Sequence, residues 1–202
     1  LDSHLALAVH TDLKAATLSD FVRLARNHPG GLTFGSAPIG SPPHMADQLF
    51  QREAGYKATV VPYKAGNFAL ADLAAGRVHY TLDAPGATLP HAQTGKVRIL
   101  AVSGARRLAL LPDVPTIAES GIQGYAYVTW FGVAAPVGVP AVAVKRLNEA
   151  LAAISNSSDA RSWGATQGLD PVSSTPEAFA ALIRSEYEKW GPLIRQSGIR
   201  LE

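Results

Sequence analysis

"LTFGSAPIGSPPHMADQLF" (residues 32–50) is the stretch that predicts the fold of this chain. An apolar run that suits a β-strand ends in a loop of small residues at 35–41, and a helical pattern of apolar residues follows at once. Ser41 stands where the helix N-cap is expected, and Pro42 suits the first helical position, where its missing N–H needs no partner. The stretch therefore predicts a strand, a tight loop and a helix.

The same alternation continues as far as residue 103. Short apolar runs predict strands, and the segments between them predict helices. The expected strands are 5–10, 32–35, 58–63, 78–82 and 97–103. Four helices are expected: one that begins at an N-cap of Thr17 or Ser19, one that begins after Ser41 and ends at Gly55, one over 68–76 and one over 87–95. Nearly continuous apolar strands are typical of a parallel sheet that is covered on both faces. We therefore expect a mostly parallel α/β sheet, with ligands near the carboxyl ends of its strands.

Beyond residue 105 the pattern changes. An irregular, proline-rich segment leads to an expected strand at 126–136, and helices are expected over 140–154 and 175–197. Thr175 is the expected N-cap of the last helix, because a proline and an acidic residue follow it directly. These helices need a sheet to pack on, yet few strands remain in the sequence to form one.

This shortage of strands predicts two lobes of unequal completeness. We expect residues 10–126 to form one complete α/β lobe. Residues 1–9 and 127–202 are expected to supply hinge strands, near 5–9 and 127–133, and the C-terminal part of another lobe. The rest of that other lobe would lie before residue 1.

Composition narrows the classes of function. The chain has 202 residues, of which 47% are hydrophobic and 17% charged, which suits a globular protein. Its net charge is only +2 and its basic residues are scattered, so no stripe for nucleic acid is expected. It contains no cysteine, which excludes disulfides and thiolate metal sites. The most apolar run is too short to cross a bilayer, and no signal peptide opens the sequence, so any export signal was removed or never included.

Catalytic interpretations are weak. Ser41, His44 and Asp83 have the residue types of a hydrolytic triad, but no G-x-S-x-G elbow surrounds any serine. The six histidines do not have the spacing of a zinc site, and no phosphate-binding glycine motif follows a strand. We expect neither a metal nor a cofactor.

An anion cradle explains the opening stretch better. Small residues at 35–41 allow backbone N–H groups to approach a ligand, and the helix N-terminus favours a carboxylate. Pro42 and Pro43 have no N–H, so the donors must come from the loop and from His44 onwards. An ordinary strand–helix turn is the alternative. Asp83, at a strand end, could accept hydrogen bonds from a ligand or cap the helix expected to begin near Gly86.

Longer segments carry a resemblance to a known family. They are "VPYKAGNFALADLAAGRV", "LDAPGATLPHAQTGKVRILAVSGARRLALLPDVPTIAESGIQGY", "WFGVAAPVGVP" and "TPEAFAALIRSEYEKWGPLIRQSGI", in addition to residues 32–50. In this order they resemble the substrate-binding proteins of tripartite tricarboxylate transporters, the TctC or Bug family. The resemblance covers almost the whole chain, and "LPDVPTIAESG" followed by "WFGVAAP" is its most specific part.

The resemblance implies an α/β fold of the type II periplasmic-binding-protein kind, with two lobes joined by hinge strands. Residues 10–126 would be lobe two, and lobe one, to which residues 1–9 and 127–202 contribute, would be incomplete here. It implies a periplasmic, non-enzymatic protein without a metal, which captures a small organic carboxylate for the membrane permease subunits of a transporter. Family members have further sequence before the point where this chain starts, including a glycine-rich loop that holds the ligand from lobe one. Lobe one is therefore expected either to be destabilised or to be completed by another copy of the chain.

The family's loop has the pattern G-S-A-G-x-G-T/S-x-x-H. In this chain Pro38 replaces one of its glycines, which removes a donor and stiffens the loop. The resemblance, together with the cradle, predicts the ligand-binding residues Ser36, Ala37, Ile39, Gly40, Ser41, His44 and Asp83. A di- or tricarboxylate, an aromatic acid and an acidic amino acid all remain open as ligands. A periplasmic sensor that signals to a receptor is the alternative function.

Overall fold

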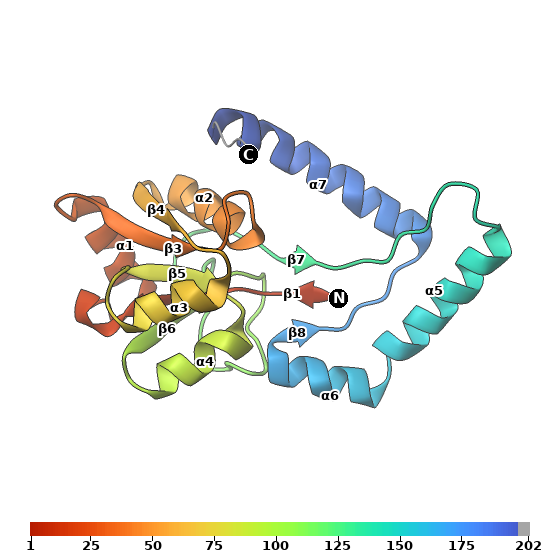
Figure 1. The fold of residues 1–202 in the computed structure, drawn as a ribbon, viewed down its shortest axis with the longest axis horizontal. Helices are drawn as coiled ribbons and strands as arrows, with labels where there is room; N and C mark the ends of the chain where they lie inside the picture. The colour runs from red at the N-terminus through yellow and green to blue at the C-terminus, as the bar shows by residue number, and fades with distance from the viewer. Residues whose placement is uncertain (198–202) are drawn as a thin grey trace.

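The structure is a computed structural model that describes residues 1–197. Two β-sheets divide it into two units that lie side by side (Figure 1). The five-stranded unit has the strand order β4-β3-β5-β2-β6, and the three-stranded unit has the order β7-β1-β8. The strands are β1 (Asp2–Ser3), β2 (Ala6–His10), β3 (Leu32–Ser36), β4 (Ala58–Pro62), β5 (Tyr80–Asp83), β6 (Val97–Val102), β7 (Thr129–Trp130) and β8 (Leu169–Asp170). The helices are α1 (Leu18–Asn27), α2 (Pro42–Ala54), α3 (Gly66–Ala74), α4 (Pro85–Gln93), α5 (Ala141–Ser155), α6 (Ser158–Gln167) and α7 (Pro176–Ser197).

The five-stranded sheet is mixed, which corrects the expectation of a mostly parallel sheet. β3 pairs in parallel with β4 and β5, whereas β2 runs antiparallel to both β5 and β6. The carboxyl ends of β3, β4, β5 and β6 therefore share one edge of the sheet. α2, α3 and α4 each begin at this edge, which faces the three-stranded unit (Figure 1).

β2 corrects the expected position of a hinge strand. Residues 5–9 were expected to form a hinge, but Ala6–His10 is the strand inserted between β5 and β6. Its side chains from Ala6 to Val9 are completely buried, because both faces of the sheet are covered at this position. The sheet of the five-stranded unit therefore includes residues before position 10.

β4 also differs from the expectation. Its apolar sequence suggested a strand covered on both faces, but Ala58–Pro62 lies at the edge of the sheet and none of its residues is fully buried. A run of apolar residues reports hydrophobicity and not position in the sheet, so it does not distinguish an edge strand from a central one.

An aromatic cluster joins α1 and α2 to the sheet. The ring of Phe21 on α1 contacts the rings of Phe50, Tyr56 and Tyr80, at centroid distances of 4.9–6.1 Å. α1 begins at a capping box, in which the Thr17 hydroxyl accepts from the Asp20 N–H and the Asp20 carboxylate accepts from the Thr17 N–H. Thr17, and not Ser19, is therefore its N-cap.

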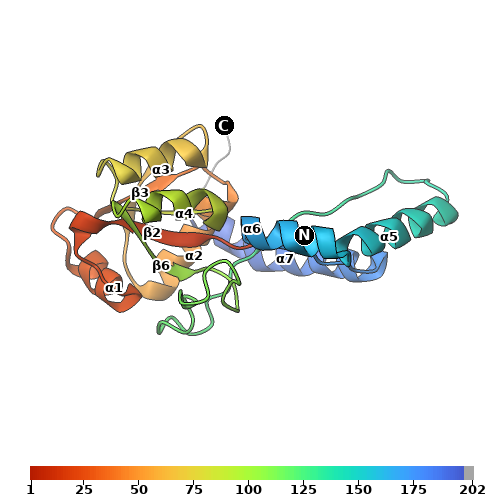
Figure 2. The same ribbon diagram turned by 90° about the horizontal axis from the view of Figure 1, so that it is seen from below.

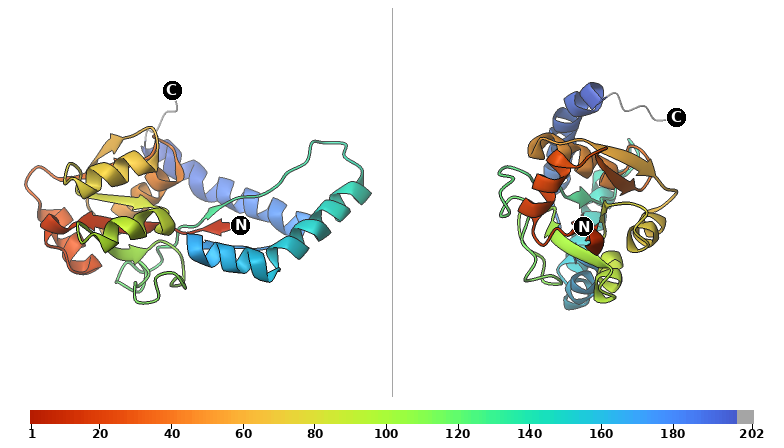
Figure 3. Two further views of the ribbon diagram at one scale, coloured as in Figure 1. Left: turned by 60° about the horizontal axis from the view of Figure 1, so that its bottom comes forward. Right: turned by 90° about the vertical axis from the view of Figure 1, so that its left-hand side faces the viewer.

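The three-stranded unit is far less compact. Its strands have two residues each, and the strand expected at 126–136 is reduced to β7. α5 buries none of its residues, and α6 is a helix that the sequence patterns did not predict. Large apolar side chains are exposed along this unit: Phe131, Val133, Val137, Val142, Leu147, Leu151, Ile154, Trp163, Val172, Leu182, Ile183 and Tyr187. α5 extends away from the rest of the molecule (Figures 2 and 3).

The last helix links the two units. α7 begins after Thr175, whose hydroxyl accepts from the Ala178 N–H as an N-cap. Near its C-terminal end the Trp190 ring lies 5.4 Å from the ring of Tyr127, and Leu193 is buried in the main core of the five-stranded unit. α7 therefore returns over the five-stranded unit (Figure 3).

Candidate functional site

A loop at the edge of the sheet where the carboxyl ends of β3, β4, β5 and β6 meet joins β3 to α2. Ser36 ends β3, and the N–H of Ser41 donates to the Pro38 carbonyl at 3.0 Å, which closes a tight turn. Gly40 within this turn has a φ of 81°, a value that favours glycine. The Tyr63 N–H donates to the Ser36 carbonyl at 2.8 Å and so joins the end of β3 to the end of β4.

Two serine hydroxyls on this loop are buried and have no hydrogen-bond partner. They are Ser36 Oγ and Ser41 Oγ, and Ser36 as a whole is 0% exposed. A buried hydroxyl without a partner is unfavourable, by about 1–3 kcal/mol. Ser36 and Ser41 stand at the two ends of the loop, and Ser41 is the N-cap residue of α2, a helix N-terminus where an anion is favoured. Both hydroxyl groups are therefore unused within the described part of the chain.

Ser41 corrects one detail of the expectation. It occupies the N-cap position of α2, but its side chain makes no capping hydrogen bond. Pro42 and Pro43 remove the N–H groups of the first two helical positions, so only the His44 N–H remains for a cap to bind. The Ser41 hydroxyl is therefore not used by the helix.

His44 has a different role from the expected donor in the first helical turn. Its side chain is buried, and its Nδ1 accepts a hydrogen bond from the Gly40 N–H at 3.1 Å. Burial lowers the pKa of His44, which favours the neutral ring that this acceptor role requires. The Gly40 N–H is consequently held inside the loop, which corrects its expected role as a ligand donor. Ala37 is half-buried and Ile39 is exposed on the same loop.

Asp83 lies on the neighbouring strand end, beside the start of α3. Its Oδ1 accepts from the Ala84 N–H at 2.7 Å, and burial raises the pKa of Asp83 while that hydrogen bond lowers it. A Cβ on Gly66, the first residue of α3, would collide with the Asp83 carboxyl group. Glycine is therefore required at position 66. The sequence patterns gave this residue no role, although it stands in the segment "YKAGN" (63–67). The N-cap of α4 is Ala84, so Asp83 does not cap that helix.

The catalytic interpretation does not fit these contacts. In residues 1–197, no hydrogen bond joins Ser41 to His44 or His44 to Asp83, and His44 Nδ1 is occupied by Gly40. Within the same residues, no group of three or more potential ligands could hold a metal ion. No helix in the described part of the chain is both long and apolar enough to cross a membrane.

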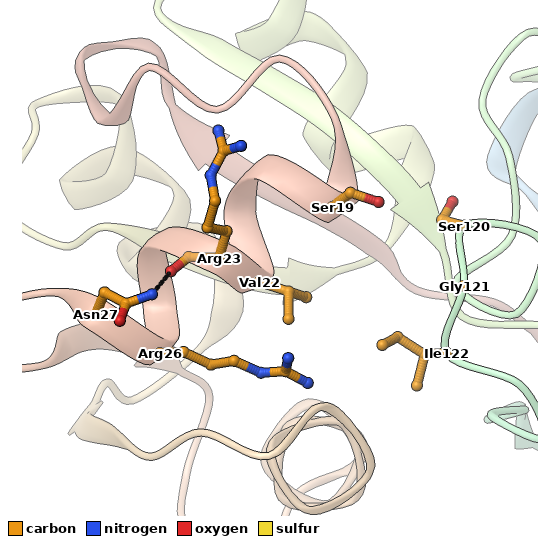
Figure 4. A pocket seen from close by; sticks show the side chains of 8 residues that line it. All are labelled: Ser19, Val22, Arg23, Arg26, Asn27, Ser120, Gly121 and Ile122. Atoms are coloured by element: carbon orange, nitrogen blue, oxygen red, sulfur yellow. Dashed lines mark hydrogen bonds between the residues drawn. The ribbon is translucent and has the colours of Figure 1, made fainter.

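One surface cavity lies away from the β3–α2 loop. It has a volume of about 350 Å³ and lies between α1 and residues 120–122 (Figure 4). Two of its polar side chains are already bonded within the chain: Arg26 donates twice to the Ala54 carbonyl, and Asn27 donates to the Arg23 carbonyl. A second cavity, of about 420 Å³, also borders α1. Neither cavity is lined by Ser36, Ser41 or Asp83.

Comparison with known proteins decides the family. The sequence model described as "Tripartite tricarboxylate transporter family receptor" matches residues 2–199. The chain belongs to this receptor family. Among its relatives, a UPF0065 protein of Pseudomonas sp. (strain P51) is 35% identical over 93% of the chain and 56% of its own length. Protein BugT of Bordetella pertussis is 30% identical over 100% of the chain and 62% of its own length.

Solved structures of receptors have the same fold. R. palustris Rpa4515 with adipate has a TM-score of 0.86 and 34% identity over 98% of this chain and 66% of its own. MatC from Rhodopseudomonas palustris with bound malate has a TM-score of 0.76 and 28% identity over 96% of this chain and 67% of its own. The chain therefore spans roughly 60% of the length of the curated relatives named above and about two-thirds of these structures.

Proposed function

We propose that this receptor-family chain binds a small organic carboxylate for a tripartite transporter, in the periplasm and without catalysis. One observation carries the proposal: Ser36 Oγ and Ser41 Oγ are buried without a partner at the two ends of the loop that leads into α2. A carboxylate accepts hydrogen bonds through both of its oxygens, so it can satisfy two hydroxyl donors at once. The relatives with adipate and malate support this class of ligand. Delivery to membrane permease subunits is proposed from the family alone.

The loop contacts give each residue a proposed role. Ser36 and Ser41 donate their hydroxyls to the ligand carboxylate, with the N–H groups of Ala37 and Ile39 as further donors. His44 keeps the loop in shape through Gly40. Asp83, whose pKa is raised by burial, faces the remainder of the ligand, where a hydroxyl, an amine or a water can donate to its free oxygen. In its ionised form Asp83 would repel a second acid group of the ligand, whereas in its protonated form it can donate a hydrogen bond to that group, so Asp83 acts on ligand choice.

Nuclear magnetic resonance on the ¹⁵N-labelled chain tests this proposal. Titration with adipate, malate and citrate should shift the amide signals of residues 36–44. Adipamide, which has the carbon chain of adipate without its charges, should leave these signals in place. Ser36→Ala and Ser41→Ala should each weaken the response roughly ten-fold, as expected for a lost charge-assisted hydrogen bond.

A matched control separates this site from the cavities along α1. Ser19 is exposed and lines both cavities. Ser19→Ala should leave the response to the acids unchanged. If no acid moved the 36–44 signals, or if adipamide moved them equally, the proposed carboxylate site would be wrong. Hydrolysis of a generic ester that disappeared in Ser41→Ala would instead favour an enzyme.

A further inference from the structure

Besides α7, two extended crossings of the chain join the two units, and one buried serine binds both crossings. The first crossing is Ser3–Leu5, between β1 and β2, and the second is Tyr127–Thr129, which leads into β7. Ser103 Oγ accepts from the Leu5 N–H at 2.9 Å and donates to the Tyr127 carbonyl at 2.7 Å. The Ser103 N–H donates to the Leu5 carbonyl, and the Tyr127 N–H donates to the Ser103 carbonyl, each at 2.8 Å. The crossings are therefore fixed to each other at the end of β6.

A charged group lies beside this crossing point. His4, in the first crossing, is 3% exposed, and its Nε2 lies 2.9 Å from Asp170 Oδ2. Asp170 belongs to β8 of the three-stranded unit. The same Asp170 oxygen lies 2.7 Å from a guanidinium nitrogen of Arg106, which follows β6 of the five-stranded unit. Asp170 thus joins a crossing strand of the chain to a loop of the other unit.

The surroundings of His4 show that its ring is placed by close packing. A Cβ on Gly104 would collide with the His4 ring, so the loop after β6 can cover this ring only with glycine at 104. His4 Nδ1 is buried without a partner. The neutral form with its proton on Nε2 lets the ring donate to Asp170, and it leaves no N–H unsatisfied. Sequence reasoning gave none of these residues a role.

We propose that Asp170 is a latch that holds the two units at one relative angle by bonding His4 and Arg106 together. Few-residue hinges allow domains to rotate unless other contacts restrain them. The crossings at 3–5 and 127–129 are such hinges, and α7 adds apolar contacts at one side of them. The ion pair of Asp170 with Arg106, together with the contact of Asp170 with His4, is a further restraint beside the first crossing. Its effect on ligand capture rests on the proposed function, because closure of the units on a carboxylate changes the angle that the latch fixes.

The absence of cysteine makes the inter-unit distance measurable. Lys57→Cys in the five-stranded unit and Ser162→Cys on α6 provide two exposed positions for spin labels in the full chain. Double electron–electron resonance without ligand should give a narrow distance distribution in this background. Asp170→Asn and Arg106→Gln should each broaden it, to roughly double its width, because the two units are then released at the latch.

Arg107→Gln is the matched control. Arg107 adjoins Arg106, but it pairs with Glu119 at 3.0 Å inside the five-stranded unit. This variant should keep the narrow distribution. Arg106 has a largely exposed side chain, so Arg106→Gln should keep the thermal unfolding temperature of the parent chain. If Asp170→Asn fails to fold, the result for Arg106→Gln therefore decides the test. An unchanged distribution in Arg106→Gln, or equal broadening in Arg107→Gln, would overturn the latch.

Adding adipate or malate then separates the latch from the proposed function. If the variants broaden the distribution but no acid changes it, the latch stands and the carboxylate function fails. If an acid shifts the distance in the parent chain and the variants match the parent without ligand, the function stands and the latch fails.

Discussion

His44 Nδ1 accepts a hydrogen bond from the backbone N–H of Gly40, four residues earlier in the chain. The first turn of α2 therefore fixes the loop that precedes it. Because Nδ1 is the acceptor, the neutral ring has its proton on Nε2. The shape of the candidate site thus depends on a side chain that the sequence pattern alone placed among the ligand donors.

Replacing His44 should therefore disturb the loop before it affects any ligand. His44→Ala leaves the Gly40 N–H without its acceptor, and the expected loss is about 1–3 kcal/mol of unfolding free energy. His44→Asn places an amide oxygen near the position of Nδ1, and it should recover part of the loss. Urea unfolding of the three proteins measures the effect. Equal stability of the alanine and asparagine variants would contradict the acceptor role.

Buried serines in this chain should fall into two classes when truncated. Ser36→Ala removes a hydroxyl that has no partner, so stability should stay the same or rise by about 1 kcal/mol. Ser103→Ala removes a hydroxyl that both accepts and donates, and it should cost about 1–3 kcal/mol. Thermal unfolding compares the two variants directly. A large loss in Ser36→Ala would mean that its hydroxyl supports the fold and not a ligand.

Asp47 should make the stability of the chain depend on pH. It is completely buried on α2; Oδ1 accepts from the Tyr80 hydroxyl at 2.8 Å, and Oδ2 accepts from Gln51 Nε2 at 2.5 Å. Burial raises the pKa of Asp47 from 3.8 to about 7, although both hydrogen bonds lower it. Between about pH 4 and 7 the folded state holds a proton that the unfolded chain has released. This contribution to stability is therefore complete below about pH 4 and is lost as the pH rises through 7.

Asp47→Asn isolates this contribution from other titrating groups. The difference in unfolding free energy between the parent and this variant should fall by a few kcal/mol from pH 4 to 7.5, at about 1.4 kcal/mol per pKa unit. Asp72→Asn is a control of opposite sign. Hydrogen bonds from Tyr63 and Arg77 lower the pKa of Asp72, so its contribution is lost as the pH falls. A difference that did not change with pH would contradict a buried proton on Asp47.

The exposed apolar face of the three-stranded unit should cause self-association of the 202-residue chain. Leu147 and Ile154 on α5 are 53% and 62% exposed, among many other large apolar side chains of the unit. Many exposed large apolar side chains on one unit are typical of an interface. Sedimentation velocity should show association that increases with concentration and that weakens in Leu147→Lys/Ile154→Lys. Phe68→Lys, on α3 of the other unit, is the control. A compact monomer at all concentrations would refute the prediction.

Much of the five-stranded unit could be predicted from local patterns. Turn residues predict the loop before α2 and the end of α2 at Gly55. Turn residues and periodicity together predict the order of strands and helices up to residue 102. Strand position did not follow, because pairing between distant segments leaves no local signal. Residues 5–9 were therefore expected to form a hinge strand, and the strand at 58–63 was expected to be covered on both faces. The short strands β1, β7 and β8 have two residues each, too few for a periodic pattern.

The candidate site could be located from the sequence, but its bonding could not. Small residues and Ser41 before a helix indicate an anion cradle, and the structure places Ser36 and Ser41 there with unused hydroxyls. Sequence does not show which N–H groups are already bonded within the chain. Gly40 was expected to face a ligand for that reason, although His44 holds its N–H. The collision that excludes a side chain at Gly66 depends on Asp83, which lies on another strand.

The central position of β2 also sets the order in which the chain can fold. β2 pairs with β5 and β6, which end about 75 and 95 residues later in the sequence. During synthesis its backbone groups therefore have no sheet partners until those strands have emerged. The five-stranded sheet is therefore completed late, when β5 and β6 pair with β2. A nascent chain that stops short of Val102 contains an apolar strand that must be kept from aggregating until its partners arrive.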